Sequence, residues 1–68
     1  MQININGEIK TLDTEHITLS NLLLNENLST SSGIALAVNF IVIPKKEWPN
    51  FTLKDNDQVT IIKAVQGG

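Results

Sequence analysis

The chain opens on an alternation of apolar and polar residues in which Met1, Ile3 and Ile5 are the apolar members. An alternation of period two is typical of a strand with one buried face. Asn6-Gly7 follows, the dipeptide favoured in two-residue type I′ turns because both positions accept positive φ. A return strand is predicted over about residues 8–12, so the segment is expected to form an antiparallel hairpin.

A helix is predicted to begin near residue 18, where the apolar spacing changes from two to that of a helix. Thr18 can accept a hydrogen bond from a free amide of the first helical turn. Ile17 and Leu22 occupy the two positions of a hydrophobic staple. The apolar face of this helix comprises Leu19, Leu22 and Leu23. The helix is expected to end at Asn25 or Asn27, before a polar loop over residues 29–33.

Strands return in the second half of the chain. Residues 34–38 alternate large and small, so Ile34, Leu36 and Val38 are expected in the core and Ala35 and Ala37 on the opposite face. After a turn at residues 39–40, a short strand over 41–43 should end at Pro44, because proline cannot donate to a ladder.

One helical turn is predicted over residues 44–48, closed by Pro49. A turn follows at residues 55–57, where Asn56 can take the left-handed conformation. The last strand is predicted over residues 58–65, with one face formed by Val59 and Ile61 and the other by Thr60, Ile62 and Ala64.

These elements predict an α+β fold of the ubiquitin-like β-grasp type: a mixed sheet of about five strands curled over one main helix. The prediction requires the first and last strands to pair at the sheet centre. The expected organisation is one β-grasp domain over residues 1–65 and a flexible tail over residues 66–68.

Composition narrows the class of function. The chain has 68 residues, no cysteine, a formal charge of −2, and lysine without arginine. Disulfides and thiolate chemistry are therefore excluded, and no basic run suggests nucleic acid. The longest apolar run, residues 34–38, is too short to span a bilayer. We expect a cytoplasmic protein.

Few side chains suggest catalysis. His16 is the only histidine, and a loop position without a chemical role is the favoured interpretation. Asp55 and Asp57 flank Asn56 and favour a turn over a cation site. The sequence has no glycine-rich phosphate loop. From these three observations together, we expect no enzyme activity and no bound cofactor or metal.

Two features remain as candidate functional sites. The sequence ends in Gly67-Gly68, a narrow tip whose carboxylate could react in a partner's active site, although a frayed end is the alternative. The second feature is an apolar outer face that predicts a docking surface. Its residues are Thr60, Ile62, Ala64, Ala37 and Gln66. The alternative is that the helix covers this face and the strand register is inverted. Trp48 is expected to cover the core rather than to anchor a partner.

The chain resembles the ThiS family, the small ubiquitin-like sulfur carriers of thiamin biosynthesis. The resemblance is carried by residues 35–39, 42–44 with Trp48, 53–62 and 65–68, and the first half fits it too. Each motif is weak alone, but the ordered set with a terminal Gly-Gly is specific. Asn56 departs from the family, which usually has glycine there, and asparagine tolerates the same backbone.

The resemblance implies that an E1-like adenylyltransferase of the ThiF type uses ATP to adenylate the Gly68 carboxylate. Sulfur from a donor such as a cysteine desulfurase system then gives a thiocarboxylate, which supplies a ThiG-type thiazole synthase. Gly67 would provide clearance in a narrow channel. Three alternatives remain open: the small subunit of molybdopterin synthase, a ubiquitin-like modifier joined to lysines through Gly68, and a plain binding module.

Overall fold

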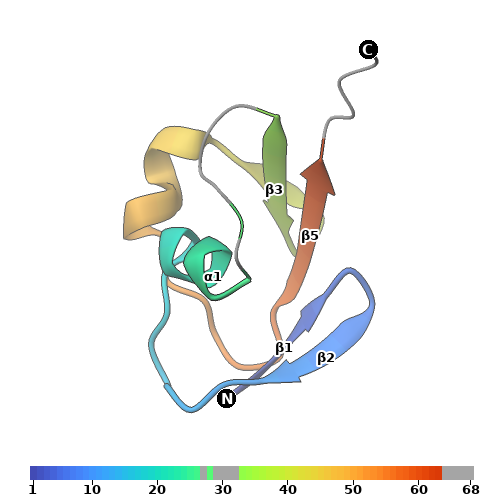
Figure 1. Ribbon diagram of the computed structural model, residues 1–68, viewed down its shortest axis with the longest axis vertical. Helices are drawn as coiled ribbons and strands as arrows, with labels where there is room; N and C mark the ends of the chain where they lie inside the picture. The colour runs from blue at the N-terminus through green and yellow to red at the C-terminus, as the bar shows by residue number, and fades with distance from the viewer. Residues whose placement is uncertain (27, 29–32, 64–68) are drawn as a thin grey trace.

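The computed structural model describes residues 1–26, 28 and 33–63 (Figure 1). Within them lie five strands, one α-helix and one 3-10 helix. The elements in chain order are β1 (Gln2–Ile5), β2 (Glu8–Thr11), α1 (Leu19–Asn25), β3 (Ile34–Val38), β4 (Ile41–Ile43), η1 (Lys45–Asn50) and β5 (Gln58–Lys63).

The five strands form one mixed sheet in the order β2-β1-β5-β3-β4. The first and last strands pair in parallel at its centre, and the other pairs are antiparallel. Figure 1 shows α1 packed over one face of this sheet. The predicted β-grasp arrangement is therefore confirmed, including the central pairing of β1 with β5.

The N-terminal hairpin forms where the sequence places it. Asn6 and Gly7 both have positive φ, at 51° and 90°, as a type I′ turn requires. The carboxamide of Asn4 steadies the turn, since its Oδ1 accepts a hydrogen bond from the Gly7 amide at 2.8 Å. The return strand β2 ends at Thr11, one residue earlier than expected.

Helix α1 begins as predicted, with Thr18 as its N-cap. The Thr18 Oγ1 accepts a hydrogen bond from the Asn21 amide at 3.2 Å. The apolar face predicted for the helix is fully buried, and its members pack with Ile17 in the core. The helix ends at Asn25, one of the two expected positions.

The core lies between α1 and the inner face of the sheet. Its buried members are Ile3, Ile5, Ile17, Leu19, Leu22, Leu23, Leu36, Val38, Trp48, Leu53, Val59 and Ile61. Trp48 is 2% exposed, and its indole Nε1 donates to the carbonyl of Ile43 at 2.9 Å. The prediction that Trp48 covers the core is confirmed.

The segment around Trp48 differs from the prediction in one respect. Pro49 is expected to close a single helical turn, but η1 is a 3-10 helix that continues through Pro49 to Asn50. Proline fixes φ near −65°, which lies within the range of a 3-10 helix. Pro49 therefore interrupts an α-helix but can continue a 3-10 helix. The Phe51 amide then donates to the Trp48 carbonyl at 3.4 Å.

Two expectations concern the C-terminus of the chain. The last strand is predicted to run to residue 65, and β5 is described only to Lys63. The division between a domain over residues 1–65 and a tail over 66–68 lies outside the described residues and stays a prediction. Among the helices that the structure describes, none is long and apolar enough to cross a membrane.

Candidate functional site

The residues predicted to carry function divide into two groups. Gly67 and Gly68, together with Ala64 and Gln66, lie outside the described residues. The others lie on the sheet face turned away from α1, which we call the outer face. It is built by β3 and β5, whose register brings Ala37 beside Thr60. The expected register is confirmed, because the helix covers the opposite face.

Ile62 is the most prominent of the predicted docking residues. It lies opposite Ala35 across the β3–β5 pair, and 53% of its side chain is exposed. Thr60 is half-buried on the same face. Because Ala35 on the neighbouring strand β3 is small, the side chain of Ile62 projects beyond it on the outer face.

Ala37 lies on the expected face but is only 7% exposed. Its cross-strand neighbours are Thr60 on β5 and Val42 on β4. A methyl group between two larger side chains offers little surface, so Ala37 forms the floor of this region and contributes little contact area of its own. The buried position of Ala37 was not expected.

The outer face also includes apolar residues that the sequence reasoning did not select. Val42 on edge strand β4 is 68% exposed, and Ile9 on β2 is 69% exposed. Ile9 lies opposite Asn4, which itself lies opposite Gln58, so these residues share the outer face. Alternate residues of a strand share one face, so counting positions from each hairpin turn assigns Ile9 and Val42 to the outer face. The sequence therefore contains a signal that could have identified them.

The outward positions of all five strands carry no ionisable side chain over the described residues. On the strands, the charged side chains stand at positions of the other face: Lys10, for example, lies opposite the buried Ile3 and forms a 3.7 Å ion pair with Glu26. The outward set comprises Gln2, Asn4, Ile9, Thr11, Ala35, Ala37, Val42, Gln58, Thr60 and Ile62. Such a surface suits an uncharged partner surface.

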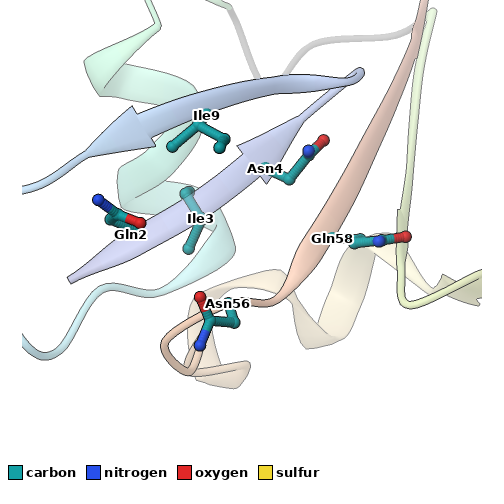
Figure 2. A pocket seen from close by; sticks show the side chains of 6 residues that line it. All are labelled: Gln2, Ile3, Asn4, Ile9, Asn56 and Gln58. Atoms are coloured by element: carbon teal, nitrogen blue, oxygen red, sulfur yellow. The ribbon is translucent and has the colours of Figure 1, made fainter.

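A shallow hollow of about 160 Å³ lies on this face beside the β1–β5 pair (Figure 2). Figure 2 shows the side chains of Ile9, Asn4 and Gln58 on the three neighbouring strands β2, β1 and β5. The lining is Gln2, Ile3, Asn4, Ile9, Asn56 and Gln58. Its four carboxamides can each donate and accept hydrogen bonds without carrying charge. One acceptor is already used, since Asn4 Oδ1 receives the Gly7 amide.

The carboxylates at the turn before β5 have structural partners. Asp55 Oδ1 accepts from the Gln2 amide at 2.7 Å, and Asp57 Oδ2 accepts from the Lys54 amide at 2.8 Å. Asn56 between them has a φ of 70°, so the predicted left-handed turn is confirmed. No group of three potential metal ligands occurs among the described residues.

His16 is exposed in the segment before α1, where its amide donates to Thr14 Oγ1 at 3.1 Å. The favoured interpretation of this histidine as a loop residue is therefore confirmed. Among the described residues, His16 does not form a single site with the outer face or with the acidic turn.

Comparisons with known proteins agree on one family. The model of the ThiS family matches residues 2–68. The sulfur carrier protein ThiS of Escherichia coli K12 is 30% identical over 46 residues, which cover 68% of this chain and 70% of that protein.

Two solved structures have the same fold. The crystal structure of the thiamine biosynthesis protein ThiS from Geobacter metallireducens superposes with a TM-score of 0.86 at 25% identity, covering all of both chains. The solution structure of a thiamine biosynthesis protein from the same organism gives a TM-score of 0.83 at 25% identity, covering all of this chain and 88% of that one.

Proposed function

Because the chain belongs to the ThiS family of sulfur carriers in thiamine biosynthesis, we propose that it carries sulfur as a thiocarboxylate on Gly68. Members of this family are carrier proteins and not enzymes, and they bind no cofactor themselves. The observation that carries the proposal is the family match, which extends to residue 68 and so includes the Gly67-Gly68 end of the sequence.

The chemistry requires activation by a partner. A carboxylate is a poor acyl donor because it lacks a good leaving group. An E1-like adenylyltransferase of the ThiF type would join the Gly68 carboxylate to AMP from ATP and release pyrophosphate. Sulfide would attack the acyl carbon, expel AMP and give the thiocarboxylate directly. A persulfide from a donor such as a cysteine desulfurase system would instead expel AMP to give an acyl disulfide, and a thiol would then reduce the S–S bond to release the thiocarboxylate. The thiocarboxylate would then give its sulfur to a ThiG-type thiazole synthase.

The position of β5 limits where a partner can bind. Gly68 is the fifth residue after Lys63, which ends β5. Even fully extended, the five residues 64–68 would span at most about 18 Å. A partner that acts on the carboxylate must therefore contact this carrier near the end of β5. Gly67, which has no Cβ, is proposed to let the backbone pass through a narrow channel.

The part of the outer face next to the end of β5 is the proposed docking surface, because β5 contributes Thr60 and Ile62 to it immediately before the C-terminal segment. Ala64 and Gln66 are proposed to extend it. The exposed Ile62 and Val42 supply apolar area on both sides of the floor made by Ala37. The absence of charge from the described outward positions suits a partner surface that is apolar at its centre.

An intact-mass measurement tests the proposal. The carrier is incubated with ATP, a ThiF-type enzyme and a sulfur donor, and one oxygen should be exchanged for sulfur. A variant that lacks Gly68 should show no exchange. If the full chain stays unmodified while the same enzyme converts another carrier, the proposal is wrong. Conjugates of higher mass in cells would instead favour the ubiquitin-like modifier.

A further inference from the structure

The two neighbours of β5 support it over different lengths. On one side, β3 pairs with β5 as far as Lys63. On the other side, β1 pairs with it only as far as Val59, because the chain turns away at Asn6. The end of β5 therefore lies beyond the backbone ladder of β1, on the side where the C-terminal segment is joined to it.

The side chain of Asn6 continues that ladder. Its backbone amide donates to the Val59 carbonyl at 3.0 Å. Its Oδ1 accepts from the Ile61 amide at 2.8 Å, and its Nδ2 donates to the Ile61 carbonyl at 3.3 Å. A carboxamide offers the same donor and acceptor as a peptide group, so Asn6 satisfies both backbone groups of Ile61 as a further strand residue would.

The backbone of residue 6 makes this contact specific to asparagine. Its φ of 51° belongs to the left-handed region, which asparagine and glycine tolerate better than other residues. Glycine would preserve the turn but has no carboxamide. The sequence signal Asn6-Gly7 predicts the hairpin, whereas the hydrogen bonds to Ile61 are visible only in the folded chain.

A second asparagine holds the other end of β5, with its side chain as acceptor and its backbone amide as donor, while its Nδ2 donates to Asp57 Oδ1 at 3.1 Å. Asn39 also has a φ of 51°, and its Oδ1 accepts from the Gln58 amide at 3.0 Å. Its own amide donates to the Gln58 carbonyl at 2.7 Å. Beside the ladder with β3, the strand is thus held at its start by Asn39 and near its end by Asn6. Of these two asparagines, Asn6 is the one that acts close to the C-terminal segment.

We propose that Asn6 is a positioning residue that holds the end of β5 and so fixes the point to which residues 64–68 are joined. The inference rests on the proposed role of Gly68 as the sulfur-carrying residue. Without the Asn6 contact, β3 alone would hold the end of β5. The strand end would then separate from the sheet more often, and each separation would lengthen the chain between the sheet and the carboxylate. The effective concentration of a tethered group falls as its tether lengthens, so fewer encounters would place the carboxylate in the partner's site.

Three asparagine-to-glycine variants separate positioning from stability. Asn6→Gly removes the carboxamide and keeps a residue that accepts positive φ. Asn39→Gly makes the same change at the start of β5. Asn56→Gly is the matched control, because Asn56 is also left-handed and its side chain makes only a 3.4 Å hydrogen bond to Asp55.

Two measurements are made on the full chain: amide hydrogen exchange at Ile61 and Lys63, and the kinetics of thiocarboxylate formation with a ThiF-type enzyme. In Asn6→Gly we expect exchange at Ile61 to be about tenfold faster. We expect kcat to fall about fivefold with KM unchanged. Asn39→Gly and Asn56→Gly should stay within about twofold in both measurements, once the exchange rates are corrected for any loss in the global free energy of unfolding.

Asn6→Asp provides a milder test should the glycine variant fold poorly, since it keeps an acceptor for the Ile61 amide and loses the donor. Its exchange rate and kcat should lie between those of the parent and Asn6→Gly. The inference is overturned if Asn6→Gly or Asn6→Asp matches the control in exchange, or if kcat is no lower than in Asn39→Gly. Failure of the parent chain to form any thiocarboxylate would overturn the proposed function and the positioning role together.

Discussion

At the scale of single residues, the distribution of charge separates the two faces of the sheet. The chain contains twelve charged side chains, five basic and seven acidic. None of them stands at an outward position of a described strand, whereas Ile62 is exposed there. An exposed isoleucine amid uncharged neighbours costs little in the free carrier and supplies apolar area when a partner covers it.

Replacing Ile62 tests the docking surface. Ile62→Glu should lower kcat/KM for activation at least about tenfold, because an unpaired carboxylate would be buried against an uncharged partner surface. Leu24→Glu is the matched control: Leu24 is 66% exposed and belongs to α1, on the other side of the sheet. That control should leave kcat/KM within about twofold. Equal activation kinetics of the two variants would show that Ile62 does not lie in the interface.

At the scale of elements, the β3–β4 hairpin contains a residue that its turn does not favour. Asn39 and Phe40 both have positive φ, at 51° and 69°, as in a type I′ turn. Glycine is the usual second residue of such a turn, and a bulky side chain there is strained. Phe40 is 84% exposed, so burial does not offset this strain.

Phe40→Gly should therefore raise the free energy of unfolding by about 0.5–1 kcal/mol, since relief of strain exceeds the entropy that glycine adds to the unfolded chain. Phe40→Ala is the control, because it removes the aromatic ring but keeps a Cβ at positive φ. Equilibrium denaturation with urea gives both values. A gain in alanine as large as in glycine would attribute the effect to the exposed ring and not to the backbone.

At the scale of the whole molecule, the domain depends on one small core. A chain of this size buries only about 60% of the surface that its unfolded form exposes. It has no cysteine to form a disulfide. Domains below about 70 residues rarely gain more than about 3–5 kcal/mol from one core. Each fully buried side chain, such as Leu22, therefore contributes a large share of the stability.

Two leucines on the same helix make this dependence measurable. Leu22 is fully buried, and truncating a buried leucine to alanine costs about 2–5 kcal/mol. Leu22→Ala should therefore leave a large fraction of the chain unfolded at 25 °C. Leu24→Ala, at a 66% exposed position, should change the free energy of unfolding by less than about 0.5 kcal/mol. Circular dichroism during thermal unfolding distinguishes the two, and a cooperative, near-parental transition in Leu22→Ala would contradict the single-core account.

Local chemistry explains which features could be predicted from the amino-acid sequence. The turn at Asn6-Gly7, the cap at Thr18 and the alternation in β3 depend on residues near in sequence, so they could be predicted with nearly correct bounds. The predicted helix end at Pro49 is wrong because the fixed φ of proline suits a 3-10 helix as well as a helix end. The family, too, could be inferred from the sequence, since its motifs are ordered along the chain.

The way in which distant segments combine is visible only in the folded chain. The contact of Asn6 with Ile61, the covering of Ala37 by Thr60 and Val42, and the joining of Ile9 to the outer face all depend on strand order and register. Period-two patterns assign each strand two faces, but they do not state which strands lie side by side. In the folded chain, one face of the sheet packs against α1. The uncharged outward positions of the described strands lie on the opposite face, beside the end of β5.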